Sequence, residues 1–152
     1  MAVILVECLF CKIVDGSVPS KKVYEDENVL CFLDINPANP GHTLVISKKH
    51  FENIFDADNE ILESMINTAK IIANRLKERL GAEGVNIIQN NGREAGQLVN
   101  HIHIHVIPRY KHDKVMITYP RAKMEKKDFD EIQKKLQEET NDNEDMDDDF
   151  DW

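Results

Sequence analysis

The chain has 152 residues, a length that fits one domain with a sizeable core. Its formal net charge of -9 arises at the end of the chain, because residues 138–152 hold nine acids and no Lys or Arg, whereas residues 1–137 carry 19 acids and 19 bases. A neutral body argues against a dedicated nucleic-acid binder, and no apolar run is long enough to span a membrane. We therefore expect neither a nucleic-acid nor a membrane partner.

The composition also predicts how the chain is divided and where it resides. We expect one domain over residues 1–137 and a solvated, disordered acidic tail over 138–152, with docking by Phe150 and Trp152 as the alternative. The apolar run 1–6 is too short for a signal peptide and lacks a basic segment and a cleavage site. Cytoplasm is therefore the expected location, and there a Cys-x-x-Cys pair is more typical of a metal clip or a redox motif than of a structural disulfide.

The predicted elements follow from turn residues and apolar periodicity. A short helix is expected over residues 8–14, followed by turn residues over 15–20. Strands are expected over 23–25, 29–34, 42–47, 85–89 and the run that begins at His101. The clearest helix runs from about residue 58 to residue 80, with Asp58 as N-cap and Gly81 after its last turn.

A charged helix over 127–139 completes the predicted elements and is expected to pack by Phe129, Ile132 and Leu136. The strands and the long helix are grouped rather than alternating along the chain. This grouping favours an α+β fold with an antiparallel sheet of about five strands.

Three histidines, His101, His103 and His105, alternate with branched apolar residues in one short run. In a β-strand they share one face, and the apolar residues between them share the other face, which we expect to be buried. Because the ordinary pKa of histidine lies near neutrality, such a row indicates nucleophilic, acid/base or metal chemistry. A chance polar face is the alternative explanation.

Strand geometry argues against one metal ion bound by all three rings. With a strand rise of ~3.3 Å per residue, His101 and His105 start ~13 Å apart, whereas a zinc–nitrogen bond measures ~2.1 Å. We therefore expect divided roles, with a central nucleophile and neighbours that serve the phosphate and the structure. The nucleophile must present a lone pair on one ring nitrogen while the other nitrogen donates to a fixed acceptor.

The run from His101 to Ile107 resembles the signature of the histidine triad (HIT) nucleotide hydrolases and transferases. The resemblance extends from Cys8 to Arg109 and includes several separated motifs in the same order: Leu9, Phe10, Lys12 and Ile13; Phe32, Asp34, Ile35 and Pro37; Gly41, His42, residues 44–46, Lys48, Lys49 and His50; Asn90, Gly92, Ala95, Gly96 and Gln97. It implies a five-stranded antiparallel sheet with one long helix and short flanking helices, paired into a homodimer.

The resemblance also implies a role for each matched residue. His103 would attack the α-phosphorus of a purine nucleotide or dinucleotide to give a covalent nucleoside-phosphohistidine, which water then cleaves. His105 would contact the α-phosphate or the leaving group, and His42 would support the site from a facing strand. The remaining implied contacts are those of Asp34 with the ribose hydroxyls, of Phe10, Ile13, Phe32 and Ile35 with the base, and of Asn90 and the backbone amides of Gly96, Gln97 and Leu98 with phosphate oxygens.

Each of these residues also has an ordinary structural explanation. Asp34 could begin the turn before Asn36, and Gly96 could be only a turn glycine. The four apolar residues could be core, and His42 could be a hydrogen-bonded histidine without a catalytic role. Leu98 departs from the family pattern, which often has Ser or Thr there, so a hydroxyl that would assist the phosphate or the leaving group is missing.

Cys8 and Cys11 have the spacing of two zinc-binding thiolates, and such a site needs two more ligands. Some prokaryotic HIT proteins, and the related nucleotidyltransferases of galactose metabolism, resemble this chain in pairing such cysteines with two histidines. The implied ligands are Cys8, Cys11, His50 and His101, a closed set that makes the zinc structural. A redox pair and two free thiols are the alternatives, and Cys31 is expected in the core.

The favoured interpretation is a nucleotide-phosphate hydrolase or nucleotidyltransferase that needs no protein-bound metal for catalysis, with Mg²⁺ only as a companion of the substrate phosphates. Two rivals stay open. One is a catalytically weak nucleotide-binding or interaction protein. The other is a metallohydrolase that binds zinc through His103 and His105.

Overall fold

The computed structural model describes residues 7–137 of the chain. The apolar run 1–6 and the acidic tail 138–152, with Phe150 and Trp152, lie outside the described residues. Contacts divide the chain into two units, residues 1–116 and residues 117–152. The sequence-based boundary after residue 137 stays a prediction.

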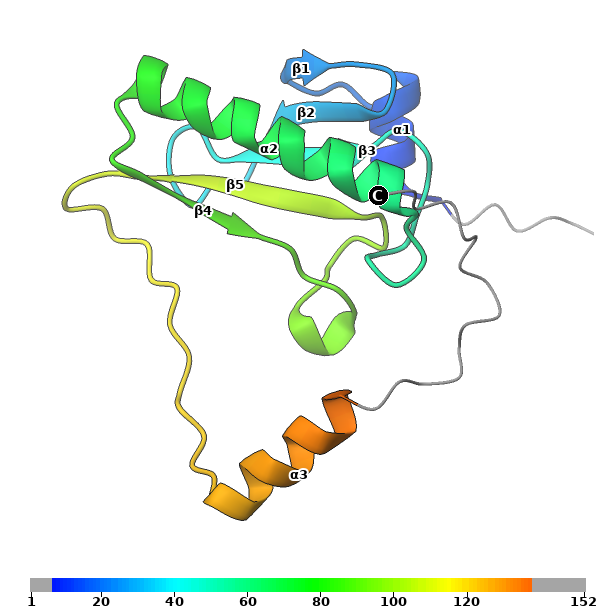
Figure 1. The fold of residues 1–152 in the computed structure, drawn as a ribbon. Coiled ribbons are helices and arrows are strands. Elements are labelled where there is room, and N and C mark those ends of the chain that lie inside the picture. The colour runs from blue at the N-terminus through cyan, green and yellow to red at the C-terminus, as the bar shows by residue number, and fades with distance from the viewer. Residues whose placement is uncertain (1–6, 138–152) are drawn as a thin grey trace, which may run out of the picture. The chain divides into compact units, whose positions relative to one another are not determined.

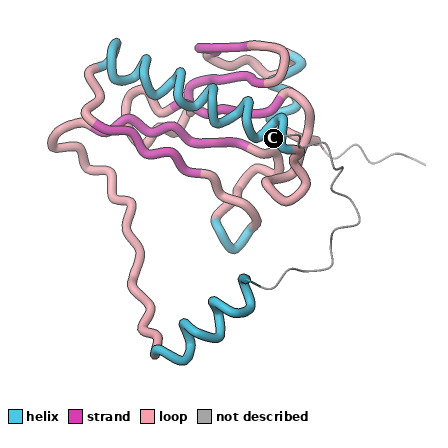
Figure 2. The backbone as a smooth tube through the Cα atoms, in the orientation of Figure 1, coloured by secondary structure: helices cyan, strands magenta, loops and turns pink. Residues whose placement is uncertain are grey.

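The first unit contains one antiparallel sheet of five strands (Figures 1 and 2). Along the sheet the strands lie in the order β1-β2-β3-β5-β4, so β5, which carries the histidines, lies between β3 and β4. The strand bounds are β1 (Lys22–Glu25), β2 (Val29–Leu33), β3 (Thr43–Ser47), β4 (Gly84–Ile88) and β5 (His103–Arg109). This sheet confirms the predicted α+β class and the predicted strand count.

Helix α2 (Asn59–Leu80) crosses one face of the sheet (Figure 1). Its ends match the prediction, since Asp58 Oδ1 accepts from the Ile61 amide over 2.8 Å and Gly81 takes a left-handed conformation with φ of 71°. Met65, Ala69 and Ile72 of α2 pack on one face of the sheet. The side chains of this face are Val29, Cys31, Val45, Ile104 and Val106, together with Ile102 just before β5. Cys31 and the apolar residues that alternate with the histidines therefore lie in the core, as predicted.

Helix α1 (Leu9–Asp15) packs on the residues of the opposite face of the sheet. Phe10 and Ile13 of α1 join a second apolar cluster with Leu30, Phe32, Leu44 and Ile46. In the register of β3 and β5, Ile46 pairs with His103 and Leu44 pairs with His105. The catalytic candidates therefore lie on the α1 side of the sheet, and α2 shields the other side.

Two predictions about elements are corrected by the structure. The strand begins at His103 and not at His101, because the Ile102 amide donates to the Phe51 carbonyl over 2.8 Å and the chain bends there. In the second unit, helix α3 (Lys126–Gln137) has no buried residue, so Phe129, Ile132 and Leu136 are exposed rather than packed. None of the helices within residues 7–137 is both long and apolar enough to cross a membrane.

Candidate active site and metal centre

His103 opens β5 and is held in one orientation by the backbone. Its Nδ1 lies 2.6 Å from the carbonyl oxygen of His101. A carbonyl only accepts, so Nδ1 carries the proton and Nε2 keeps its lone pair. The ring of Phe10 meets the imidazole edge-on, with centroids 5.1 Å apart. This arrangement meets the requirement stated for a histidine nucleophile.

In a second pair of imidazoles, His42 and His105, a backbone amide fixes which ring nitrogens carry the protons. The Ala38 amide donates to His42 Nδ1 over 3.0 Å, so the proton of a neutral His42 is on Nε2. That Nε2 lies 2.9 Å from His105 Nδ1, which becomes the acceptor and leaves the His105 proton on Nε2. His105 therefore presents an N–H donor beside His103, and the two ring centroids are 5.1 Å apart.

Burial keeps these imidazoles neutral. It lowers the pKa of His103 and of His42, and in both cases the nearby Asp34 carboxylate offsets part of the change. For His105, burial and then the neighbouring His103 and His42 lower the pKa to about 4. At neutral pH the site therefore offers one unprotonated nucleophilic nitrogen and one N–H donor, without a cationic ring.

These histidines line a cavity of about 510 Å³, which lies within the range of small-molecule sites, about 300–1,000 Å³. Most of the residues that line the cavity are apolar, and its polar lining includes the histidines, a carboxylate and an amide side chain. All but one of the residues predicted for catalysis or nucleotide binding line it: Phe10, Ile13, Phe32, Asp34, Ile35, His42, Asn90, Gly96, Leu98, His103 and His105. The side chains of Ile35 and Leu98 are 91% and 93% exposed, so they border the cavity without being part of the core.

Asp34 has the structural role that the sequence offered as an alternative, and it also borders the cavity. Its Oδ1 accepts from the Asn36 amide over 2.8 Å, which closes the turn. Its Oδ2 lies 3.6 Å from His42 Nε2. The turn thus fixes the carboxylate at the cavity wall, and the two roles are compatible.

Gln97 is the exception among the predicted nucleotide contacts. Its side chain turns away from the cavity and bonds the backbone, with Nε2 donating to Glu52 O over 2.6 Å and Oε1 accepting from Gly92 N over 2.8 Å. The backbone amides of Gly96 and Gln97 donate to Arg93 O and Gly92 O within the turn. Of the three predicted amides, those of Gly96, Gln97 and Leu98, only the Leu98 amide has no acceptor among residues 7–137. The turn therefore leaves one free amide, rather than three, for a phosphate oxygen.

Sequence reasoning did not single out Ser20, which also lines the cavity. Its Oγ is the only buried side-chain nitrogen or oxygen atom within residues 7–137 that lacks a hydrogen-bond partner. A buried hydroxyl without a partner is rare because it loses water without compensation. One serine in a turn-rich segment carries no sequence signal for this property.

The four residues of the predicted zinc set come from three segments and converge in space. Cys8 and Cys11 lie at the start of α1, His50 follows β3, and His101 lies just before β5. Cys8 Sγ and His101 Nδ1 are 3.3 Å apart, as are Cys11 Sγ and His50 Nδ1, while the two Nδ1 atoms are 3.2 Å apart. All four ligand atoms lie within 4.8 Å of one another. Tetrahedral zinc with N and S ligands separates its ligand atoms by about 3.3–3.8 Å, so the cluster fits a zinc ion.

The protonation of His101 also suits a metal ligand. Its side chain is fully buried, and Nε2 lies 2.7 Å from the Ser47 carbonyl, which leaves the Nδ1 lone pair facing the two cysteines. Burial raises the pKa of the Cys11 thiol to about 11, the opposite of the change that activates a redox Cys-x-x-Cys pair. Two thiols and two histidine nitrogens within 4.8 Å of one another form the donor set of a closed structural zinc site.

The structure does not favour a metal held by His103 and His105. Within residues 7–137, the groups that could hold an ion are the Cys8 cluster and a second group of Asp34, His42 and His105. His103 belongs to neither group.

Comparisons with known proteins agree with this geometry. The HIT domain family model matches residues 15–112. The uncharacterized HIT-like protein MJ0866 of Methanocaldococcus jannaschii is 49% identical over 129 residues, which cover 85% of this chain and 98% of the relative. The adenosine 5'-monophosphoramidase hnt1 of Schizosaccharomyces pombe is 40% identical over 102 residues, covering 67% and 74%. The crystal structure of a Zn-bound histidine triad family protein from Mycobacterium smegmatis superposes with a TM-score of 0.71 at 43% identity, covering 76% of this chain and 84% of that chain.

Proposed function

Because the chain belongs to the HIT family, we propose that it is a nucleotide-phosphate hydrolase or nucleotidyltransferase that acts at the α-phosphate through a covalent intermediate on His103. The observation that carries the proposal is the 2.6 Å contact between His103 Nδ1 and the His101 carbonyl, which leaves Nε2 as the free lone pair in the cavity. A relative named adenosine 5'-monophosphoramidase supports an adenosine phosphoramidate as substrate, and a dinucleoside polyphosphate is the alternative.

In the first step, the His103 Nε2 lone pair attacks the α-phosphorus, and the leaving group departs with the electron pair of its bond to phosphorus; an amine leaving group takes up one proton from solvent, which the second step returns. His105 Nε2–H donates a hydrogen bond to a phosphate oxygen or to the leaving atom, where negative charge develops. The chain from Ala38 through His42 holds that donor in place. Preset donors of this kind lose little free energy to reorganisation during the reaction.

In the second step, water attacks the same phosphorus, and the phosphorus–nitrogen bond of the phosphohistidine breaks. His103 Nε2 recovers the electron pair, and the extra proton of the attacking water is released. A hydroxyl or amine acceptor in place of water would give nucleotidyl transfer. The nucleotide would be positioned by Phe10 and Phe32 around the base, by Asp34 at the ribose, and by the Leu98 amide at a phosphate oxygen.

Turnover of an adenosine phosphoramidate or a dinucleoside polyphosphate tests this proposal against a catalytically weak binding protein. The experiment compares the wild type with His103→Ala at equal nucleotide occupancy. We expect the variant to lose at least about three orders of magnitude in turnover, because a missing nucleophile cannot be replaced by the neighbouring donors. Equal turnover by both proteins would rule out the His103 mechanism.

We further propose that Cys8, Cys11, His50 and His101 hold a structural zinc ion. Four protein ligands leave no open position, so bound zinc would supply cross-linking of the N-terminal segment and no Lewis-acid chemistry. The convergence of two thiols and two Nδ1 atoms supports the proposal, and the Zn-bound relative from Mycobacterium smegmatis is consistent with it.

A homodimer is also part of the proposal. The sheet has two edge strands, and β1 carries charged Lys22 and Glu25, which discourage edge pairing. The other edge strand, β4, has no charged residue, and its Ile87 is exposed. We expect two copies to pair through β4. Size-exclusion chromatography with light scattering of the wild type and of Ile87→Lys tests this, with a monomeric wild type as the contradicting result.

A further inference from the structure

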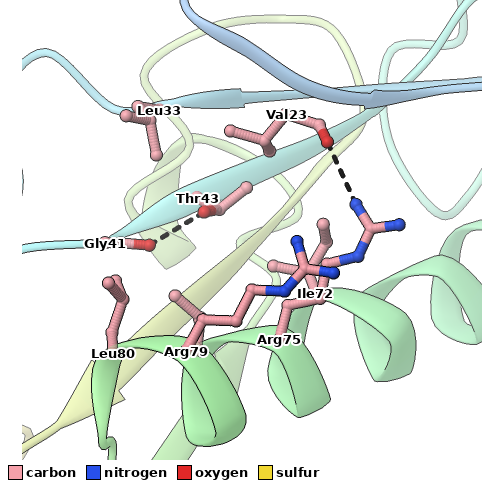
Figure 3. A pocket seen from close by; sticks show the side chains of 9 residues that line it. Val23, Leu33, Gly41, Thr43, Ile72, Arg75, Arg79 and Leu80 are labelled. Atoms are coloured by element: carbon pink, nitrogen blue, oxygen red, sulfur yellow. Dashed lines mark hydrogen bonds between the residues drawn. The ribbon is translucent and has the colours of Figure 1, made fainter.

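A second hollow lies between α2 and the sheet (Figure 3), and no histidine lines it. It has a volume of about 180 Å³ and lies between the last turns of α2 and the ends of β1, β2 and β3. Its walls are mostly apolar and include Leu33, Ile72, Leu76 and Leu80. Leu33 and Leu80 are exposed, so the hollow opens to solvent.

Two guanidinium groups border this apolar hollow. Arg75 and Arg79 lie one turn apart on α2, and both side chains extend toward the same rim (Figure 3). Arg75 donates from Nη1 to the Val23 carbonyl over 3.1 Å and lies over the Tyr24 ring at 5.5 Å. Neither arginine forms an ion pair with an acid in the part of the chain that the structure describes, residues 7–137.

The proximity of the two positive charges of Arg75 and Arg79 is unfavourable in the absence of an anion. Like charges four residues apart on a helix repel each other. The negative end of the α2 dipole favours basic residues in the last turn, where both Lys77 and Arg79 lie. Of these two, only Arg79 lines the hollow, and Arg75 lies outside the last turn, so the dipole does not explain why both guanidinium groups border an apolar hollow.

We propose that this hollow is a binding site for a small organic carboxylate that carries an apolar group of about the size of benzene. A dry apolar cavity of about 150 Å³ holds benzene, so the volume of about 180 Å³ suits one such ring or a short alkyl chain. The carboxylate would accept paired N–H bonds from the Arg79 fork, since a guanidinium matches the planar geometry of a carboxylate. Arg75, held by the Val23 carbonyl, would add the second positive charge.

The site adjoins the loop that carries two cavity residues. Leu33 and Gly41 line the hollow, and they directly precede Asp34 and His42. The Asp34 amide donates to the His42 carbonyl over 2.9 Å, which joins the two ends of this loop. A ligand in the hollow would therefore contact residues at both ends of the loop, and the amide resonances of Asp34 and His42 report on it.

The test is an NMR titration of the full chain with 3-phenylpropionate, followed through backbone amide resonances. Two matched probes separate the contributions: 3-phenylpropanamide lacks the charge, and acetate lacks the ring. We expect saturable binding of 3-phenylpropionate, at least about fivefold weaker binding in Arg79→Gln, and less than twofold change in Lys77→Gln. Both substitutions remove one exposed charge from the same turn of α2, so a general charge effect would move them equally.

Three results would overturn the proposal. They are unchanged binding in Arg79→Gln, equally tight binding of the amide or of acetate, and absence of saturable binding of 3-phenylpropionate. An excess of adenosine monophosphate serves as a further control, because displacement of the probe by the nucleotide would place the probe in the histidine cavity instead. The titration needs no turnover, so its outcome is independent of the proposed catalytic function.

Discussion

His101 and His103 are linked by a 2.6 Å hydrogen bond between a main-chain carbonyl and a ring nitrogen, and the side chain of His101 belongs to the Cys/His cluster. One residue thus contributes its imidazole to the proposed metal site and its carbonyl to the proposed nucleophile. The Ser47 carbonyl, 2.7 Å from His101 Nε2, fixes the orientation of the His101 ring.

Removal of one thiol ligand should release the metal and disturb His103. We expect Cys11→Ser to lose bound zinc and to lower the free energy of unfolding by more than about 3 kcal/mol, because metal binding and folding are coupled. Metal analysis and urea unfolding measure both effects. The ¹⁵N shifts of the His103 ring report whether its Nδ1 still donates to the His101 carbonyl.

Two variants serve as controls for the zinc prediction. Cys31→Ala removes a thiol from the core, outside the cluster, and should keep the zinc. His103→Ala should also keep it. The opposite pattern, with zinc lost from His103→Ala and retained in Cys11→Ser, would instead support a metallohydrolase.

His105 should make the protein less stable in mild acid. Burial lowers its folded-state pKa to about 4, below the ordinary value of 6.5, so the unfolded chain binds more protons between these two pH values. Stability is therefore fully present above pH 6.5 and falls as the pH decreases toward 4. The contribution of His105 between pH 7 and pH 5 is on the order of 1–2 kcal/mol.

Urea unfolding of the wild type and of His105→Asn at both pH values isolates this contribution from those of the other histidines. We expect the wild type to lose more stability than the variant on acidification. Equal losses would show that His105 is not held in its neutral form by the fold.

Leu98 should limit catalysis at the mouth of the cavity. A hydroxyl at this exposed position would add a hydrogen bond to the phosphate or the leaving group, and one such bond contributes about 0.5–1.5 kcal/mol. We expect Leu98→Ser to raise turnover of a substrate with a poor leaving group by up to about tenfold. Leu98→Ala is the matched control, since it removes the same bulk without adding a hydroxyl. Equal rates for the two variants would refute a role for the hydroxyl.

Ser20 should reduce the stability of the ligand-free protein. Its buried Oγ has no partner, so Ser20→Ala should raise the free energy of unfolding by about 1 kcal/mol. Ser17 is the control from the same turn, because its Oγ donates to the Lys12 carbonyl over 3.3 Å and its loss should not stabilise the protein. Thermal unfolding of both variants decides the matter. A destabilised Ser20→Ala would mean that the hydroxyl is bonded in solution.

Local patterns predicted most of the fold. Alternation in the histidine run indicated that Ile102, Ile104 and Val106 face the core, and the caps of α2 lie at the expected residues. The start of β5 was wrong because the bend before it depends on a bond from Ile102 to Phe51, a residue remote in sequence. The exposed face of α3 was also not predicted, since periodicity alone shows that a stripe is apolar and not that it is covered.

The family resemblance implied His42, His103 and His105 as site residues, and the sequence analysis required one ring nitrogen of the nucleophile to donate to a fixed acceptor. Which backbone groups orient the rings, the His101 carbonyl for His103 and the Ala38 amide for His42, depends on the folded chain and could not be predicted. Gln97 has a motif position, yet tertiary bonds direct its side chain into the loop framework. The hollow that Arg75 and Arg79 border could not be predicted, because helical spacing alone does not show which strand residues lie opposite these arginines.

The covalent intermediate on His103 is the central claim, and trapping it is the most direct test. The protein is mixed with an adenosine phosphoramidate, quenched within milliseconds to seconds in alkali, where phosphohistidine survives, and analysed by peptide mass spectrometry. We expect a nucleotidyl group on the peptide that contains His103 in the wild type and none in His103→Ala, while the Lys77→Gln control forms it normally. Turnover by the wild type without any adduct, or an adduct that persists in His103→Ala, would contradict this claim.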